Sequence, residues 1–378
     1  MISVNEPLIA KNAKKYVLDC IESGWVSSAG EYIGKFEKNF ADFLGVKYAT
    51  TTTNGTASLH LAICALGIKK GDEVIIPDLT IISCALAVIY TGATPVLVDV
   101  EKETGNIDPS KIEEKITKRT KAIMVVHLYG HPVDMDPILS LAKKYKLAVI
   151  EDAAEAHGAE YKNRKVGSIG DVGCFSFYGN KIITTGEGGM VVTNNKKLYE
   201  RAKLLKDLAH SRKRRFFHEE IGFNYRMTNL QAALGLAQLE EVEKYIQKKR
   251  RMASLYGKGL SKVSFIELPK EYPWLKSVYP APERCGVYWM YALKIKKNSP
   301  ITKDKVRQNL LKLGVDTRDF FYPLHRQPAL RALGLFKDER YPVSQDLSER
   351  GFYIPSGLAL TAKQIKTVID AIKKAVKA

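Results

Sequence analysis

Two hydrophobic patterns alternate along the first two thirds of the chain. Short runs rich in β-branched residues, typical of strands, are separated by stretches in which apolar residues recur every three or four positions, as on one helical face. In residues 56–67, for example, Leu59, Ala62 and Ile63 share such a face. Strands that alternate with helices predict an α/β fold with a mostly parallel sheet. The expected strands are residues 47–52, 72–77, 95–100, 121–128, 147–152, 174–178 and 189–194.

The last third of the chain follows a different pattern. A long helical stretch from residue 229 to about residue 260 begins apolar and becomes strongly charged, which predicts a bridge between two domains. A Pro- and Tyr-rich loop, one strand at 288–295 and two helices at 303–314 and 361–378 follow it. A chain of 378 residues is long enough for two cores. We therefore predict a large α/β domain over 1–245 and a smaller C-terminal α+β domain over 246–378.

Composition narrows the class of protein. The hydrophobic share of 45% and the charged share of 26% are ordinary for a soluble globular protein. The first residues carry no signal-peptide pattern, and the longest apolar run, 81–90, is too short to cross a bilayer, so we expect a cytoplasmic protein without a membrane partner. The five cysteines form no C-x-x-C pair and the seven histidines show no ligand spacing, which predicts neither a disulfide framework nor a metal site.

The net charge of +18 would permit a nucleic-acid partner. Most lysines, however, lie in helical stretches of mixed charge, which are typical of solvated faces, so we predict no nucleic-acid binding. The exception is a basic and aromatic cluster, "HSRKRRFFH", over residues 210–218. It could contact a phosphate or a nucleobase, or it could be an exposed loop, and the sequence leaves both open.

Polar residues follow three of the expected strands at their carboxyl ends, where parallel sheets bind ligands. Gly55 and Thr56 open a helix, whose free N–H groups suit a phosphate, although a plain strand-to-helix turn would look the same. Asp152 ends a hydrophobic strand, as a semi-buried acid that needs a cation or as a helix cap. Lys181 precedes a glycine-rich turn, as an amine nucleophile or as a lysine that extends into solvent.

Together these residues meet the needs of pyridoxal 5'-phosphate. This cofactor requires a phosphate site, an acid that keeps its ring nitrogen protonated and a lysine that forms a Schiff base. The chain contains no G-x-S-x-G, G-x-G-x-x-G or Walker A sequence that would favour acyl transfer, dinucleotide binding or ATP hydrolysis. The sequence therefore predicts a pyridoxal-phosphate enzyme.

Ordered motifs also resemble a known family. The runs "NGTASLHLAICALGIKKGDEVIIPDLT", "VIEDAAEAHGAEY", "VGSIGDVGCFSFYGNKIITTGEGGMVVTN" and "GFNYRMTNLQAALGLAQLE" closely resemble the DegT/DnrJ/StrS sugar aminotransferases, which are fold-type-I pyridoxal-phosphate enzymes. Within that family, "HLYGHPVDMD" and "YRMTN" look most like the branch that moves the amino group of L-glutamate to C4 of GDP-4-keto-6-deoxy-D-mannose for a surface polysaccharide such as O-antigen. The resemblance covers residues 24–239 almost without gaps and resumes at "VYWMY" and "FYPLH".

The resemblance assigns roles to individual residues. Lys181 is implied to be the Schiff-base lysine, Asp152 the partner of the ring nitrogen, and Glu155 a neighbour of the ring oxygen. Asn224 is implied to reach the phosphate bound by the neighbouring subunit, which makes the chain a homodimer with shared active sites. The implied phosphate ligands are Gly55, Thr56 and Ser176. The implied contacts to the nucleotide sugar are Arg214, Arg215, Arg318 and His325.

Two departures from the family pattern leave alternatives open. Ile81 stands where relatives usually have an aromatic residue over the cofactor ring, and residues 206–218 and 270–286 diverge from the GDP-sugar branch. The alternative substrates are UDP- or dTDP-linked 4-keto-6-deoxy sugars and an eight-carbon keto-sugar acid. A dehydratase of the same fold would replace Lys181 with histidine. A cofactor-binding regulatory protein is the alternative of another class.

Overall fold

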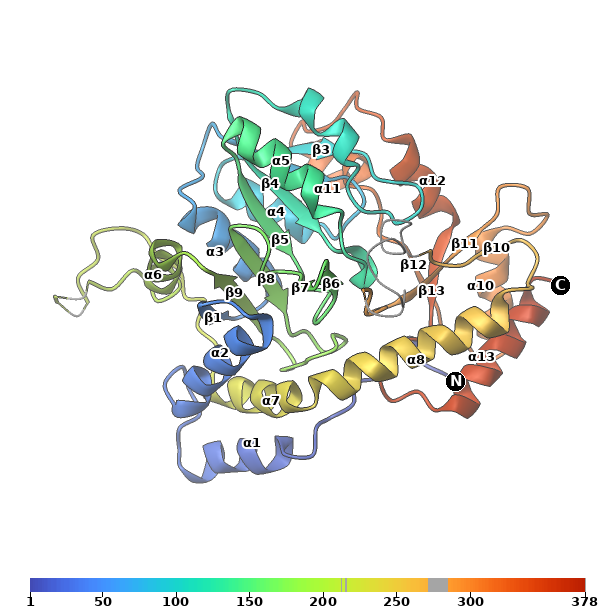
Figure 1. Ribbon diagram of the computed structural model, residues 1–378, viewed down its shortest axis with the longest axis horizontal. Helices are drawn as coiled ribbons and strands as arrows, with labels where there is room; N and C mark the ends of the chain where they lie inside the picture. The colour runs from blue at the N-terminus through green and yellow to red at the C-terminus, as the bar shows by residue number, and fades with distance from the viewer. Residues whose placement is uncertain (212, 215, 271–284, 378) are drawn as a thin grey trace.

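The computed structural model describes residues 1–211, 213–214, 216–270 and 285–377 (Figure 1). Within them, the strands of a seven-stranded sheet lie in the order β1-β9-β8-β5-β4-β2-β3. All seven predicted strands are therefore confirmed. Their bounds are β1 Tyr48–Thr52, β2 Glu73–Pro77, β3 Thr94–Val98, β4 Thr120–Val126, β5 Ala148–Asp152, β8 Val172–Ser176 and β9 Gly189–Thr193.

The sheet is mostly parallel, as predicted. Only β9 runs antiparallel to its neighbours, β8 and β1, and the other adjacent pairs are parallel. The parallel strands β2, β4 and β5 therefore bring their carboxyl ends to one edge. A small hairpin of β6, Glu160–Tyr161, and β7, Arg164–Lys165, was not predicted, because strands of two residues carry no periodic pattern.

Helices cover both faces of the sheet. The strands therefore carry apolar side chains on both faces, each packed into its own hydrophobic cluster. In β2, Ile75 belongs to one hydrophobic cluster, while Val74 and Ile76 belong to the other. Phe36 and Phe40 of α2 pack into the first cluster. The helices of this unit are α1 Ala13–Glu22, α2 Glu31–Leu44, α3 Gly55–Ala65, α4 Ser83–Tyr90, α5 Met135–Tyr145 and α6 Lys196–Leu205. Three-residue 3₁₀ helices lie at η1 Pro109–Lys111, η2 Glu113–Lys115 and η3 Leu128–Gly130.

A smaller unit follows, as the sequence predicts. Its four-stranded antiparallel sheet has the order β10-β11-β13-β12 and packs against helices through a third hydrophobic cluster that includes Leu293, Leu310 and Ile372. The strands are β10 Ile266–Glu267, β11 Tyr291–Ile295, β12 Arg318–Asp319 and β13 Gly351–Ile354. Its helices are α10 Lys303–Lys312 and α13 Ala362–Ala375. Between them in the chain, η5 Leu324–Arg326, α11 Pro328–Ala332 and α12 Pro342–Arg350 bury Leu324, Leu330 and Leu347 in the hydrophobic clusters of the large sheet.

The predicted bridge consists of two helices, α7 Asn229–Glu240 and α8 Val242–Leu260, rather than one. The backbone leaves helical geometry at Glu241, where φ is −104° and ψ is 3°. Ile246 still packs into the core of the large unit, whereas Met252 packs into that of the small unit, so α8 spans both (Figure 1). The division after residue 245 stays a prediction. In the described part of the chain, no helix is both long and apolar enough to span a membrane.

Candidate active site

A cavity of about 630 Å³ opens at the carboxyl ends of the parallel strands. This volume is in the usual range for a small-molecule site. The wall comes from the turn between β1 and α3, from the ends of β5 and β8, and from Trp289 and Tyr353 of the small unit. Six of the predicted site residues line it: Gly55, Thr56, Asp152, Glu155, Ser176 and Lys181.

The start of α3 forms one end of the cavity. Asn54 caps the helix, since its side-chain oxygen accepts a hydrogen bond of 2.8 Å from the N–H of Ala57. Gly55 is required by close packing, because a Cβ there would lie 2.7 Å from Cβ of Ser176. Thr56 donates from its hydroxyl to Oγ of Ser83 over 2.9 Å. Free N–H groups, hydroxyls and the positive end of the helix dipole suit a phosphate at this place.

Asp152 is buried at the end of β5, with a relative exposure of 4%. Its Oδ1 accepts a hydrogen bond from the N–H of Ala154 at 3.0 Å, and its Oδ2 accepts one from Sγ of Cys84 at 3.2 Å. Burial raises the pKa of the Asp152 carboxyl, while these two donors and Lys181 act in the opposite direction. The chain after Asp152 forms turns, not a helix, so the helix-cap interpretation is wrong.

Lys181 stands in the turn that follows β8, with its amine inside the cavity. Nζ lies 3.7 Å from Oε1 of Glu155 and 3.8 Å from the centroid of the Trp289 ring. Burial lowers the pKa of the Lys181 amine, and Glu155 and Asp152 partly offset this. A lysine with a lowered pKa carries a larger share of neutral amine, which is the form that attacks a carbonyl. The alternative of a lysine extended into solvent does not fit this position.

Glu155 faces Lys181 from the loop after β5. Its Oε2 accepts a hydrogen bond of 2.8 Å from the N–H of Tyr129. Burial raises the pKa of Glu155 to about 7, against the opposing effect of Lys181. Tyr129 has a φ of 54°, in the left-handed region that side chains seldom adopt. This strained backbone aims the Tyr129 N–H at the carboxylate of Glu155.

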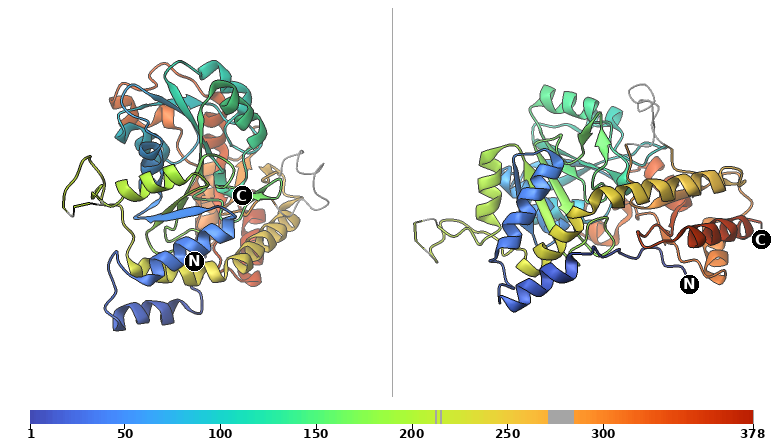
Figure 2. Two further views of the ribbon diagram at one scale, coloured as in Figure 1. Left: turned by 60° about the vertical axis from the view of Figure 1, so that its left-hand side comes forward. Right: turned by 60° about the horizontal axis from the view of Figure 1, so that its bottom comes forward.

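The other predicted residues do not line this cavity. Asn224 and Arg214 are exposed in the segment between α6 and α7, whose described residues form a loop that projects from the body of the protein before it returns to α7 (Figure 2). Arg318 is exposed on β12 and donates to Oδ1 of Asp316 at 2.9 Å. Arg215 lies outside the described residues.

His325 lies deeper, as a buried residue of η5. Its Nδ1 is 2.8 Å from Oδ2 of Asp78, and its backbone N–H donates to Oδ1 of the same side chain over 2.8 Å. Asp78 directly follows β2, so this pair ties η5 to the large sheet. It does not bring the imidazole to the wall of the cavity.

Two residues of the site had no signal that sequence reasoning recognised. Cys84, which the sequence singled out only as one of five cysteines without a predicted disulfide or metal role, contacts Asp152, and its position one helical turn after Thr80 in "PDLTIISC" was the available clue. Trp289 covers the amine of Lys181 and was noticed only as part of "VYWMY". Ile81 does line the cavity, as expected for a residue beside the cofactor ring.

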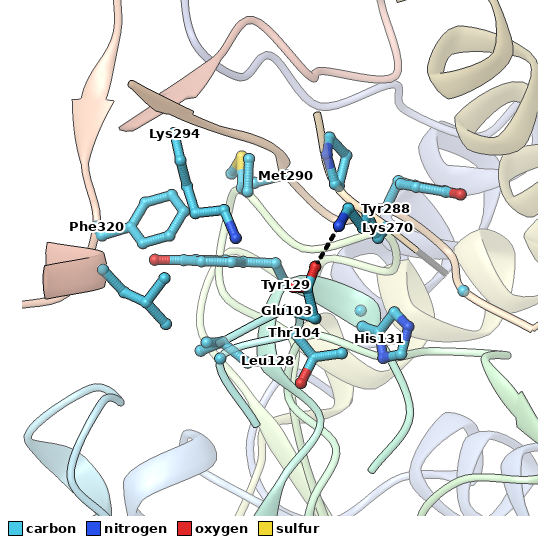
Figure 3. Close-up of a pocket in the computed structure, with 16 residues that line it drawn as sticks. Glu103, Thr104, Leu128, Tyr129, His131, Lys270, Tyr288, Met290, Lys294 and Phe320 are labelled. Atoms are coloured by element: carbon cyan, nitrogen blue, oxygen red, sulfur yellow. Dashed lines mark ion pairs between the residues drawn. The ribbon is translucent and has the colours of Figure 1, made fainter. Parts of the chain in front are cut away.

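A second, smaller cavity of about 60 Å³ has Tyr129 in its wall (Figure 3). Lys181, Glu155 and Asp152 do not line it. Its wall includes Met290 and Phe320 and the ion pair between Lys270 and Glu103, with 2.8 Å between Nζ and Oε2. Among the described residues, no group of three or more His, Cys, Asp or Glu side chains is arranged to hold a metal ion.

Comparisons with known proteins agree with this geometry. Residues 7–373 match the model of the DegT/DnrJ/EryC1/StrS aminotransferase family. A relative from Escherichia coli O157:H7, GDP-perosamine synthase, is 46% identical over 373 residues, which are 99% of this chain and 98% of the relative. GDP-perosamine synthase of Caulobacter vibrioides is 44% identical over 371 residues, covering 98% of this chain and 97% of the relative.

Solved structures extend the similarity to the fold. S. venezuelae DesV, in complex with a ketimine intermediate, matches with a TM-score of 0.89 and 33% identity, covering 97% of this chain and 95% of that one. Helicobacter pylori PseC, an aminotransferase of pseudoaminic acid biosynthesis, matches with a TM-score of 0.91 and 27% identity over 100% and 99% of the two chains. The predicted fold class and cofactor are thereby confirmed. The chain belongs to the DegT/DnrJ/EryC1/StrS family and is a pyridoxal-phosphate-dependent aminotransferase.

Proposed function

We propose that this aminotransferase moves the amino group of L-glutamate to C4 of GDP-4-keto-6-deoxy-D-mannose, giving GDP-perosamine. The observation that carries the proposal is the identity of 40–46% along the whole chain to three relatives named GDP-perosamine synthase. The gathering of Lys181, Asp152 and the start of α3 in one cavity supports it. Family membership alone supports the amine transfer, while the named relatives support the choice of sugar.

The residues of the cavity fit pyridoxal phosphate. Gly55, Thr56 and Ser176 would hold the phosphate, since all three line the cavity at the N-terminal end of α3, where backbone N–H groups and the helix dipole favour an anion. Asp152 would pair with the ring nitrogen, because a buried carboxyl with a raised pKa gains a cationic partner there. When bound, the cofactor supplies an electron sink for the carbon that loses its proton.

Lys181 is the proposed acid and base of the reaction. Its amine would take the proton from the α-carbon of glutamate and, in the second half-reaction, which runs in the reverse direction, would deliver a proton to C4 of the sugar. The lowered pKa of Lys181 suits this exchange, because only the neutral amine accepts a proton. Glu155, at 3.7 Å, can hold the ammonium between these transfers.

We predict that kcat/KM for the GDP-linked 4-keto-6-deoxy sugar exceeds that for its UDP- and dTDP-linked counterparts and for the eight-carbon keto-sugar acid by roughly tenfold or more, a difference of about 1.4 kcal/mol. The physical reason is discrimination by contacts to the base and the diphosphate, for which Arg214, Arg215 and Arg318 are our candidates. A coupled assay with glutamate as donor compares the four substrates. A clear preference for a competitor would overturn the choice of sugar and leave the aminotransferase assignment intact.

The proposed enzyme is a homodimer with shared active sites. Asn224 is exposed and does not line its own cavity, although its neighbour Tyr225 does, as expected of a residue that serves the cavity of a partner. Its segment also exposes Phe216 at 75% and Ile221 at 88%, large apolar surfaces that a second subunit would cover. His325 and the three arginines stay predictions, as do the cytoplasmic location and the role in a surface polysaccharide such as the O-antigen of lipopolysaccharide.

Mixed subunits test the shared site. If Asn224→Ala impairs activity, heterodimers of Lys181→Ala and Asn224→Ala subunits should recover up to half of the wild-type activity per dimer, since one hybrid site carries both defects and the other neither. Differently tagged subunits, refolded together and purified through both tags, allow the measurement. Dimers of two differently tagged Lys181→Ala subunits, prepared in the same way, provide the blank. Verified heterodimers as inactive as the parents would contradict the shared site.

A regulatory role is the remaining alternative from another class. One relative, 31% identical over 91% of this chain, is named a pleiotropic regulatory protein of Geobacillus stearothermophilus. The cavity favours an enzyme, because a binding protein has no need of a buried lysine with a lowered pKa opposite a buried acid.

A further inference from the structure

Lys249 is a buried lysine to which the proposed reaction gives no role. It lies in α8 with a relative exposure of 2%. Its Nζ donates to the backbone carbonyl oxygen of Trp289 at 2.7 Å and to that of Ser356. Among the described residues it has no carboxylate within ion-pair distance, and burial lowers the pKa of its amine to about 7. A buried amine is costly unless it is hydrogen-bonded, so these two carbonyls determine its place.

Trp289, the first of these partners, reaches Lys181 in two ways. The face of its ring lies 3.8 Å, measured to the centroid, from Nζ of Lys181. Its indole N–H donates over 2.8 Å to the carbonyl of Asn180, the residue directly before Lys181. The side chain of Asn5 donates to the same carbonyl, also over 2.8 Å. The indole therefore holds both the amine of Lys181 and the backbone from which its side chain extends.

Ser356, the second partner, fixes Lys249 to the small unit. Its Oγ accepts a hydrogen bond of 2.8 Å from the N–H of Tyr291, two residues after Trp289. Its backbone N–H donates to the carbonyl of Val4 over 2.7 Å. Lys249 thus joins the bridge helix, the start of β11 and the segment after β13 at one point, and Trp289 extends from that point into the active site.

We propose that Lys249 is a positioning residue for Lys181 and acts through Trp289. Its hydrogen bond to the carbonyl of Trp289, together with the second bond that anchors the amine to Ser356, fixes the Trp289 backbone, which keeps the indole over the Lys181 amine and its N–H on Asn180. An aromatic face stabilises the ammonium form of a nearby lysine, so loss of this placement favours the neutral amine. Glu155 and Asp152, the acids that face Lys181, are held by hydrogen bonds from the N–H groups of Tyr129 and Ala154, which do not involve Lys249. The inference rests on the proposed catalytic role of Lys181.

The test compares Lys249→Met, Lys249→Arg and Trp289→Leu with Lys248→Met, a matched change of an exposed lysine in the same helix. In the full-chain apoprotein, the pH dependence of Lys181 acetylation, followed by peptide mass spectrometry, gives the pKa of its amine. We expect Lys249→Met and Trp289→Leu to lower this pKa by roughly half a unit or more. In the double variant Lys249→Met, Trp289→Leu, the pKa of Lys181 should be no lower than in Trp289→Leu alone, because the effects of two residues that act in series are not additive. Lys249→Arg, which keeps N–H donors at this position, should return the pKa of Lys181 most of the way to its wild-type value.

In the holoenzyme, Lys249→Met should lower kcat about tenfold with little change in KM for glutamate, as expected when an acid–base group is misplaced. If the pKa of Lys181 is the same in Lys249→Met as in the control variant Lys248→Met, the proposal is overturned. This holds whatever effect Lys249→Met has on the unfolding midpoint. A rise of the pKa would also overturn it, since it would show direct repulsion between two amines. If Lys249→Met does not fold, Lys249→Gln, whose shorter side chain keeps an NH2 group but carries no charge, replaces it. The result can be told apart from an error in the catalytic role of Lys181. If Lys181 had no such role, Lys181→Ala would stay active.

Discussion

Replacing Lys181 with alanine should lower the rate of amine transfer by roughly 10⁴-fold or more, because general acid–base catalysis alone contributes up to about that factor. The fold and part of the cofactor affinity should survive. The start of α3, Ser176 and Asp152 are separate from the side chain that is removed, and the phosphate and ring contacts expected there remain. The measurements are steady-state turnover with glutamate and cofactor binding by equilibrium dialysis.

Two controls make the Lys181 result specific. Lys203→Ala removes an exposed lysine of α6 and should leave turnover unchanged. Lys181→Arg keeps a cation beside Glu155, but a guanidinium is neither deprotonated nor nucleophilic in proteins, so it should be as inactive as the alanine variant. Substantial amine transfer by either Lys181 variant would sink the assignment of this lysine.

The fold was predictable because the strands of the large sheet are buried on both faces. Such strands appear in a sequence as short, nearly continuous β-branched runs, and the seven runs found in this way became the seven strands. Once these strands were parallel, the rule that ligands bind at their carboxyl ends singled out Gly55, Asp152 and Lys181. The cavity that joins these three residues follows from topology, without any knowledge of side-chain geometry.

The remaining features depend on contacts that a linear pattern does not contain. Cys84 meets Asp152 across 68 positions, and Lys249 meets Trp289 across 40. Neither residue has a periodic or strand-end signature, since a buried cysteine and a charged helix are ordinary features. The break at Glu241 was missed for a similar reason, because one non-helical residue leaves the apolar spacing on both sides nearly unchanged. The contacts to the sugar and to the partner's phosphate could not be derived either, since Arg214 and Asn224, which were predicted for them, do not line the cavity of their own chain.

Asp152 allows a test in which function and stability should respond in opposite directions. Burial raises the pKa of this acid in the folded protein, so the folded state holds its proton more firmly than the unfolded chain does. Stability is therefore lost as the pH rises from the unfolded pKa towards the folded one, and the loss is complete above both. Such a cost is expected of a carboxylate kept for a cationic ring nitrogen rather than for the fold.

Asp152→Asn should consequently slow amine transfer by roughly 10²-fold or more, the typical effect of removing one electrostatic contact from a reacting site. The shape is kept, because the amide oxygen can accept the N–H of Ala154 while Nδ2 donates to Sγ of Cys84. The apoprotein should be at least as stable as the wild type at pH 8, with the difference shrinking towards pH 4, in urea unfolding experiments. Asp42→Asn, an exposed change in α2, is the control for both measurements. A variant with near-normal turnover would show that the charge of Asp152 has no part in the reaction.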